Sequence, residues 1–283
     1  MIDPAAILAH DFGAPGQGYG PRDAILYALG LGLGRDPLDP AELRFLDERA
    51  LAVLPSFAVT LCSPGMWIRA PELGVDFTKL VHAAQSARFD APLPAEAQVK
   101  GTARVASLTD RGAGRGAVLV LERTIRDAAS DALYCRLEQT LLLRGDGGFG
   151  GPAAPPPVPE APRGEPDHVE RILTSPRAAL IYRLSGDWNP LHLDPAVAKA
   201  AGFERPILHG LASYGIAGVA VSRALARDPA RIARLDCRFS GVVMPRDTLA
   251  FHIWHDGDTA ARFQAFVGER KVLDGGIIEW HRQ

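Results

Sequence analysis

Three features of this 283-residue sequence predict an α+β fold. A stretch rich in glycine and proline divides the chain into two parts, and the two parts share an internal repeat. In the second part, an apolar helix is followed by a series of strand-like segments. A helix followed by strands that can pair antiparallel with one another is typical of the α+β class.

The glycine- and proline-rich stretch covers residues 145–166, where six Gly and seven Pro occupy 22 positions. Proline cannot donate a backbone hydrogen bond, and glycine weakens both helices and strands, so this composition predicts a linker. The linker implies three parts: a first domain over 1–144, the linker over 145–166 and a second domain over 167–283.

The repeat is visible when residues 22–30 (RDAILYALG) are compared with residues 177–185 (RAALIYRLS). At this offset of 155 residues, arginine matches arginine at the start and Tyr27 matches Tyr182. Residues 55–65 and 206–215 form a second similar pair at an offset near 151. The same order of similar segments in both parts predicts an internal duplication.

Local signals then predict each element in order. The first domain has three long segments with strand-like patterning, over 97–108, 115–126 and 132–144. In the second domain, N-cap and proline pairs predict helices after Ser175 and Asp194. An apolar segment rich in small residues predicts an enclosed helix over 210–226. Strand-like segments separated by turn signals follow over 236–243, 248–255, 260–267 and 276–280.

Composition excludes several classes of protein. The formal net charge of −2 lacks the basic excess of a typical nucleic-acid binder. No apolar segment reaches the roughly 18–20 residues that cross a bilayer, and the N-terminus does not resemble a signal peptide. The three cysteines form no C-x-x-C pair, which argues against a zinc site or a disulfide framework. We therefore expect a cytoplasmic protein without a metal.

Asp187, Asn189 and His192 form the most informative group, because they share one short irregular segment after a predicted helix. A carboxylate and an imidazole five residues apart can face one pocket and perform general acid–base chemistry. Asn189 could orient either group. The alternative is structural: Asp187 caps a turn, and His192 packs with a single hydrogen bond.

Gly210 opens the predicted enclosed helix. The first N–H groups of a helix have no internal partner and lie at the positive end of its dipole. Without a side chain at this position, a carbonyl oxygen can approach the N–H and be stabilised as an oxyanion. The alternative is that Gly210 only permits a tight turn.

The motifs SGDWNPLHLDP (185–195) and FERPILHG (203–210) resemble the signature of the MaoC-like, R-specific enoyl-CoA hydratases, also called hydratase 2. The resemblance extends to residues 22–30, 110–117 and 144–151 in the first domain. It implies a double hotdog fold in which each half wraps an antiparallel sheet around one long central helix and the two sheets join.

The resemblance also implies roles for individual residues. Asp187 and His192 would be the catalytic pair, Asn189 would support them, and the Gly210 N–H would hold the thioester oxygen. The substrate-binding residues are expected to be Gly186, His209, Ser213 and Arg238. Arg238 would contact the CoA phosphates, although a solvated charge at a strand end is the alternative.

The first domain lacks the chemical groups of this site. At the two offsets, Asp187 corresponds to Gly32, and His192 corresponds to Pro37, while the dipeptide 209–210 corresponds to 58–59. We therefore expect the first domain to bind the acyl chain, with the small apolar segment 31–34 leaving room for it. His82 lies in H-A-A-Q where relatives often have H-G-E-Q, so no role is assigned to it.

These observations predict a hydro-lyase that reversibly adds water to a trans-2-enoyl-CoA and forms a (3R)-3-hydroxyacyl-CoA in fatty acid metabolism. The acyl-CoA thioester is the expected partner, CoA is part of the substrate, and no separate cofactor is expected. A homodimer is expected by analogy. Two alternatives are a MaoC-like hydratase for bulky steroid or branched acyl-CoA thioesters and a non-catalytic acyl-CoA-binding hotdog subunit.

Overall fold

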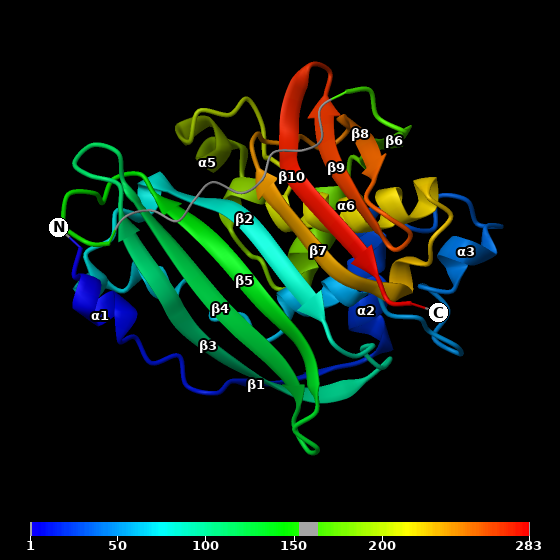
Figure 1. Ribbon diagram of the computed structural model, residues 1–283, viewed down its shortest axis with the longest axis horizontal. Coiled ribbons are helices and arrows are strands. Elements are labelled where there is room, and N and C mark those ends of the chain that lie inside the picture. Colours follow the sequence, from blue (N-terminus) through cyan, green and yellow to red (C-terminus); the bar gives the residue numbers. More distant parts are fainter. Residues whose placement is uncertain (1, 153–163, 283) are drawn as a thin grey trace.

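A computed structural model describes residues 2–152 and 164–282, and part of the predicted linker lies outside these residues. The described chain forms one ten-stranded antiparallel sheet with the order β1-β3-β4-β5-β2-β7-β10-β9-β8-β6 (Figure 1). The strands are β1 (Gly16–Tyr19), β2 (Leu80–Phe89), β3 (Ala97–Asp110), β4 (Ala117–Asp127), β5 (Leu133–Leu143), β6 (His168–Leu173), β7 (Ile232–Phe239), β8 (Thr248–His255), β9 (Ala260–Val267) and β10 (Arg270–Trp280).

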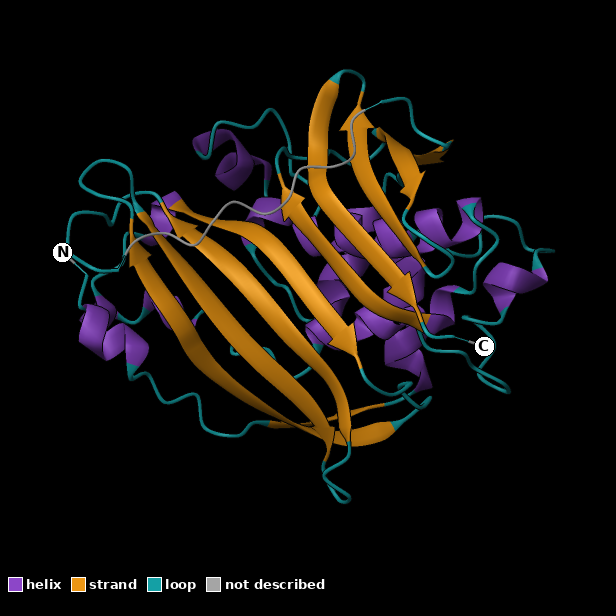
Figure 2. Ribbon diagram, in the orientation of Figure 1, coloured by secondary structure: helices purple, strands orange, loops and turns teal. Residues whose placement is uncertain are grey.

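Helices gather behind the strands of the second half, whereas the strands of the first half have few helices near them (Figure 2). The α-helices are α1 (Pro4–Leu8), α2 (Pro21–Leu31), α3 (Pro40–Leu43), α4 (Ala178–Tyr182), α5 (Pro195–Ala200) and α6 (Gly210–Ala224). Short 3-10 helices connect them: η1 (Pro55–Thr60), η2 (Trp67–Arg69), η3 (Pro71–Leu73), η4 (Phe77–Lys79), η5 (Arg183–Ser185), η6 (Pro190–His192) and η7 (Pro229–Arg231).

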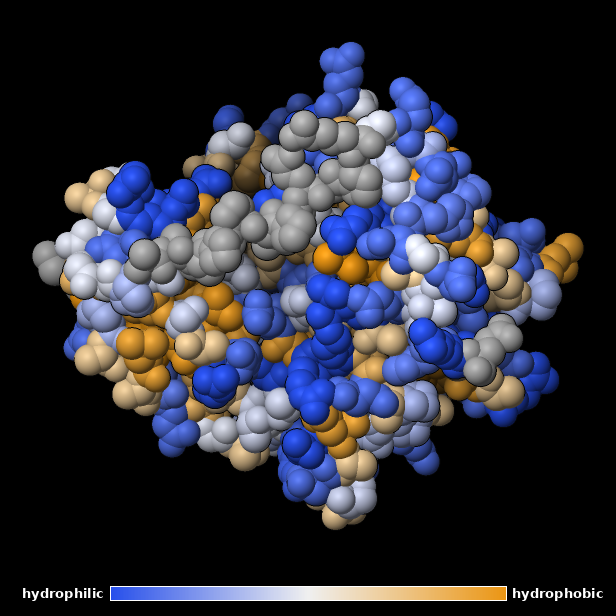
Figure 3. Space-filling view, viewed as in Figure 1, coloured by the Kyte–Doolittle hydropathy of each residue, from blue (hydrophilic) through white to orange (hydrophobic). Residues whose placement is uncertain are grey.

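The two halves meet edge to edge, so the expected pair of sheets is one continuous sheet. Strand β2 pairs antiparallel with β7 in a register that runs from Ala84 opposite Arg238 to Arg88 opposite Arg234. Asp236 of β7 accepts a hydrogen bond from Ser86 and forms an ion pair with Arg88. Because unpaired strand edges are costly, this pairing satisfies one edge of each half at once. Figure 3 shows hydrophilic side chains gathered over this junction.

The expectation of a long central helix in each half is wrong for the first half. Within the described part of that half, the segment that corresponds to α6 forms only η1, a six-residue 3-10 helix. It ends before Cys62, which adopts a positive φ of 47°. Left-handed backbone at a non-glycine residue cannot continue a right-handed helix, so the chain turns away into η2–η4.

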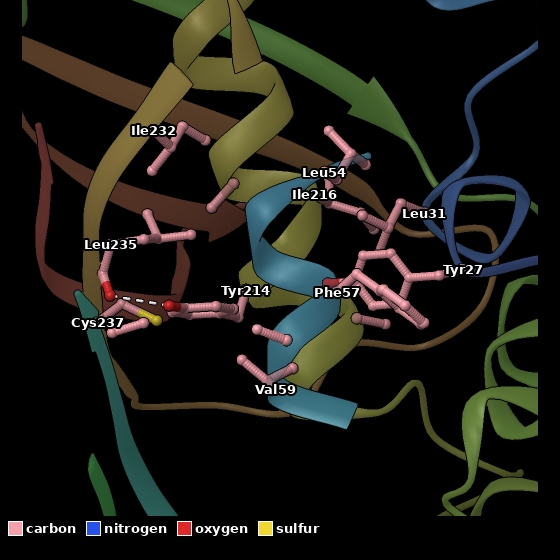
Figure 4. Close-up of a cluster of buried hydrophobic side chains, with 14 of the residues drawn as sticks. Tyr27, Leu31, Leu54, Phe57, Val59, Tyr214, Ile216, Ile232, Leu235 and Cys237 are labelled. Carbon is pink, nitrogen blue, oxygen red and sulfur yellow. Dashed lines mark hydrogen bonds between the residues drawn. The ribbon is translucent and has the colours of Figure 1, made fainter. Parts of the chain in front are cut away.

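Helix α6 is enclosed, as its composition predicted. Ten of its 15 residues are buried, and several are Gly, Ala or Ser, which allow neighbouring backbones to approach closely. At Gly215, a Cβ would lie 2.7 Å from a Leu31 side-chain carbon, so this glycine permits α2 to pack against α6. Figure 4 shows side chains from both halves meeting around α6, including Tyr27, Phe57 and Tyr214.

The strands predicted by alternation are found with small shifts at their ends. Strands β8 and β9 have the predicted bounds, and the turn between them contains Gly257 with a φ of 85°. Strand β10 is longer than predicted, because its glycines at 275 and 276 sit in a bulged part of the ladder rather than before it. In the described part of the chain, no helix has the length and apolar character needed to cross a membrane.

Candidate active site

The segment after α4 forms a tight series of turns. Gly186 adopts a φ of 109° at the end of η5, a conformation that favours glycine and that reverses the chain direction. Asp187 follows and accepts a hydrogen bond from the Asn189 N–H at 3.1 Å. Asn189 in turn caps η6 by accepting from the Leu191 N–H at 3.1 Å. These side-chain caps hold the short segment without a long helix or strand.

His192 ends η6 and is 8% exposed. Its Nδ1 lies 2.9 Å from the Ile207 carbonyl oxygen, which can only accept a hydrogen bond. Nδ1 therefore carries the proton, and Nε2 is left as an acceptor. Burial lowers the pKa of His192 from its ordinary value, so the imidazole is neutral near pH 7. The structural contacts considered for Asp187 and His192 are thus present, and within the described residues the second Asp187 carboxylate oxygen and His192 Nε2 have no hydrogen-bond partner.

His209 packs flat against His192, with ring centroids 3.6 Å apart and an interplanar angle of 26°. It is 1% exposed and directly precedes α6. Its Nε2 lies 3.4 Å from the backbone carbonyl oxygen of Asp187. Burial, reinforced by the neighbouring His192, lowers the pKa of His209 to about 3, so this ring is also neutral. His209 therefore joins the start of α6 to the segment that carries Asp187.

Asp187, His192 and His209 each offer one potential ligand atom, and these atoms lie within 4.8 Å of one another. Two imidazoles and a carboxylate are a donor set that can bind a transition metal. Among the residues that the structure describes, no other group of three acidic, histidine or cysteine side chains has this proximity. That no metal is needed stays a prediction.

Gly210 begins α6 beside this group. The carbonyl oxygen of His209 accepts hydrogen bonds from the N–H groups of Ala212 and Ser213, which start the helical pattern. Within the described residues, no group accepts a hydrogen bond from the Gly210 N–H. A Cβ at Gly210 would lie 3.3 Å from the Phe239 ring, tighter than an ordinary contact, so a side chain there would displace the helix start or the ring.

The first half contributes His82, which sequence reasoning had left without a role. A bulge between His82 and Ala84 lets His82 Nε2 lie 3.0 Å from the Ala84 carbonyl oxygen. The His82 ring meets the Phe239 ring edge to face at 4.9 Å. Burial lowers the pKa of His82 to about 4, and the charge of Asp187 opposes this shift. Bulges often redirect side chains beside functional sites, but the sequence H-A-A-Q gave no sign of this bulge.

Of the predicted substrate-binding residues, Arg238 faces away from Asp187 and His192, and Ser213 is buried at the start of α6. Arg238 pairs with Asp274 at 2.7 Å. Its neighbour Phe239 points to the helix-covered face, and side chains alternate along a strand, so Arg238 faces the opposite side of the sheet. The structure therefore places it as a strand-end ion pair. Ser213 lies in the first turn of α6 and is 2% exposed, with an Oγ that has no hydrogen-bond partner among the described residues.

The segment 31–34, expected to leave room for an acyl chain, is largely packed. Leu31 and Leu33 are 4% and 5% exposed and belong to the main hydrophobic core. The two glycines between and after them adopt φ angles of 92° and 82° that end α2. This segment therefore serves the contact of α2 with α6.

Comparisons with known proteins identify the family. The MaoC like domain matches residues 157–275, and the MFE-2 hydratase 2 N-terminal domain matches residues 18–145. The chain is 39% identical over 241 residues to the enoyl-CoA hydratase ChsH3 of Mycobacterium tuberculosis, covering 83% of each chain. It is 36% identical to the peroxisomal enoyl-CoA hydratase 2 of Arabidopsis thaliana, covering 96% of this chain and 94% of the relative.

The chain belongs to the family of MaoC-like enoyl-CoA hydratases 2. The resemblance drawn from the motifs is thereby confirmed. A solved structure of a MaoC-like dehydratase from Phytophthora capsici matches all of this chain with a TM-score of 0.85 and 29% identity. The peroxisomal multifunctional enzyme type 2 of Drosophila melanogaster matches 95% of this chain with 48% of its own, at a TM-score of 0.79 and 31% identity. Hydratase 2 members and this chain therefore share the hotdog-type fold across both halves.

Proposed function

We propose that this protein is an R-specific enoyl-CoA hydratase, a hydro-lyase that reversibly adds water to trans-2-enoyl-CoA in fatty acid metabolism. The observation that carries the proposal is the grouping of Asp187, a neutral His192 and the Gly210 N–H at the start of α6. Relatives named as enoyl-CoA hydratases at 36–39% identity support it.

In the proposed mechanism, a water molecule lies between the Asp187 carboxylate and His192 Nε2. Nε2 accepts a proton from the water because Nδ1 already holds one against Ile207. The hydroxide oxygen bonds to Cβ of the substrate, and the electron pair of the double bond moves toward the thioester. The proton then passes by way of Asp187 to Cα, so water is added without any other reactant.

The Gly210 N–H is proposed to donate to the thioester oxygen while negative charge develops on it. Such donors at the point where charge develops are commonly worth about 10²–10³-fold in kcat. The position at a helix start strengthens the donor, because the helix dipole is positive there. Asn189 supports the pair by holding the turn that presents Asp187. The acyl chain is proposed to extend toward the first half, where the long helix is missing.

The decisive experiment follows loss of conjugated absorbance with crotonyl-CoA and with longer, branched and steroid enoyl-CoA thioesters. We expect Asp187→Asn and His192→Ala each to lower kcat by about 10³-fold or more with the fold intact, since acid–base catalysis commonly contributes about 10²–10⁴-fold. Asp194→Asn is the matched control, because the Asp194 side chain caps α5 through the Ala196 and Val197 N–H groups and has no other hydrogen-bond partner among the described residues. Chiral analysis should show the (3R) product.

Other outcomes identify the alternatives. Turnover confined to branched or steroid thioesters would assign the bulky-substrate hydratase, and binding without turnover at every chain length would assign a non-catalytic subunit. Wild-type kcat in Asp187→Asn would contradict the proposed site. The cytoplasmic location and the homodimer remain predictions, which fractionation and light scattering would test.

A further inference from the structure

A group of buried polar atoms without partners lies directly behind the catalytic histidine. Among the described residues, six buried side-chain atoms have no hydrogen-bond partner, and four of them form this group. They are Tyr27 Oη, Tyr182 Oη, Ser213 Oγ and His209 Nδ1, and the Tyr27 hydroxyl lies near the hydroxyls of Ser56 and Tyr182 without a well-formed hydrogen bond to either. Each of these side chains is at most 2% exposed. Native proteins rarely leave buried polar atoms unpaired, so a cluster of four requires a reason.

The rings of this group form a continuous line from the first half to His192. The ring centroids of Tyr27 and Tyr182 are 5.7 Å apart. Those of Tyr182 and His209 are 4.9 Å apart, and His209 stacks on His192 at 3.6 Å. A side chain from the non-catalytic half therefore reaches the catalytic imidazole through two intermediates.

Glycines make room for this line. A Cβ at Gly30 of α2 would lie 3.1 Å from the Tyr182 Cα, so α2 and α4 pack closely. A Cβ at Gly215 of α6 would lie 2.8 Å from the Tyr27 hydroxyl oxygen. Tyr27 and Tyr182 are also the residues that match each other in the internal repeat. The duplicated tyrosines thus meet where the two halves and α6 come together.

The chemistry of the group is complementary. His209 Nε2 faces the backbone carbonyl oxygen of Asp187, so it carries the ring proton and leaves Nδ1 as an acceptor. Burial raises the pKa of Tyr27 and that of Tyr182, so both hydroxyls keep their protons and can donate. Each tyrosine hydroxyl can also accept, so a small rotation or one internal water is enough to connect the hydroxyls with Nδ1.

We propose that Tyr27 and Tyr182 are positioning residues, which act through His209 to hold the His192 ring so that its Nε2 faces the reacting water. This inference rests on the proposed hydratase function. The tyrosines do not touch the reacting atoms. Through them, the first half contributes to catalysis even though it lacks the acid–base groups.

A purely structural role makes a different prediction, which provides the test. In a purely structural role, removal of either hydroxyl would change stability by at most the weak interaction between the two tyrosines, and it would leave kcat unchanged. We expect Tyr182→Phe to lower kcat by about tenfold with KM changed less than about twofold, since loss of alignment acts on the chemical step. Tyr27→Phe should have a smaller effect. The double variant should match Tyr182→Phe, because both residues act through one link.

Tyr214→Phe is the matched control. Tyr214 is a fully buried tyrosine in the same core, and its hydroxyl donates to the Leu235 carbonyl oxygen at 2.8 Å (Figure 4). Its removal should lower the melting temperature and leave kcat unchanged. Wild-type kcat in both Tyr182→Phe and Tyr27→Phe would overturn the proposal. The proposal would also be overturned if kcat fell only in variants that lose stability, because a general packing defect produces that result.

A second measurement separates this proposal from the hydratase assignment. Nitrogen-15 NMR of histidine reports the tautomer and hydrogen bonding of His209 without substrate, with the signal assigned by its loss in His209→Gln. Tyr182→Phe should shift the Nδ1 signal, and Tyr214→Phe should not. Wild-type protein that turns over no enoyl-CoA would reject the hydratase function. An unshifted Nδ1 signal with wild-type kcat would reject only the positioning network.

Discussion

The two halves of the molecule contribute to the same sheet but differ in what covers it. In the second half, the 15-residue α6 lies against short strands such as β7 and β8, each of eight residues. In the first half, η1 replaces that helix, and β3 extends to 14 residues. The sheet is thus the shared framework, and the helix is where the halves diverged.

Buried Arg123 shows how the first half compensates for the missing helix. It donates to the carbonyl oxygens of Val59 and Leu61, both at 2.9 Å. A helix would have satisfied these carbonyls internally, whereas an irregular buried segment needs a side-chain donor. The comparison teaches that the second half keeps a helix whose first N–H groups serve the proposed site, while the first half satisfies two buried carbonyl oxygens with one arginine.

The largest expected effect comes from separating the halves. Residues 165–283 alone would expose the β7 edge that β2 covers from Ala84 to Arg88, so this fragment should be insoluble or inactive. Co-expression with residues 1–152 should restore soluble, active protein, which is the control. Sedimentation and hydratase assays provide the readout. A soluble, fully active fragment would show that the second half does not depend on the first.

Gly210→Ala tests the helix start that only the second half has. The added methyl group would lie 3.3 Å from the Phe239 ring, so the donor or the ring must move. We expect kcat to fall by about 10–100-fold, less than the roughly 10²–10³-fold loss from removing an oxyanion donor. The control is Gly20→Ala at the N-cap of α2, where a Cβ meets open space. Equal kcat in the two variants would speak against an oxyanion role for Gly210.

Arg123→Met tests the compensation in the first half. Two buried carbonyl oxygens would lose their donor, so we expect the free energy of unfolding to fall by about 2–4 kcal/mol. Arg136→Met, which breaks an ion pair with Asp90 on the exposed face, should cost at most about 1 kcal/mol. Urea denaturation measures both. If the two variants lose equal stability, Arg123 does not support the segment 55–62.

The smallest effects are those of pH. We expect kcat/KM to decrease on the acid side with a midpoint below pH 6.5. Burial lowers the pKa of His192, and the neutral ring is the proposed base. The buried histidines also affect stability. The pKa of His82 is about 4 in the folded chain, below the usual 6.5, so the unfolded state binds the proton first as pH falls.

The free energy of unfolding should therefore be highest above about pH 6.5 and decline toward pH 4. His82→Gln should reduce this decline, as measured by urea denaturation across the range, with exposed His255→Gln as the control. An unchanged decline in His82→Gln would show that the first half contributes no buried histidine to the acid sensitivity.

Much of the site was predictable because its residues are close in the sequence. Asp187, Asn189 and His192 lie within six positions, and local caps hold their turn. The N-terminus of α6 could be predicted from its apolar, small-residue pattern. In contrast, the stacking of His209 on His192 and the contact of His82 with Phe239 depend on long-range packing, which has no local signal in the sequence. The match between Tyr27 and Tyr182 was visible, but not that their rings meet.

By itself, the sequence determined the α+β class and most strand positions, and it placed Asp187 and His192 five residues apart in one short segment, because alternation, caps and short motifs depend on near neighbours along the chain. Only the tertiary structure decided that the two sheets fuse through β2 and β7, that the first half lacks its long helix and that Arg238 faces away from the site. These outcomes depend on which strand edges pair and which buried carbonyl oxygens receive hydrogen bonds. The partners lie far apart in the sequence, so they are fixed only when the whole core assembles.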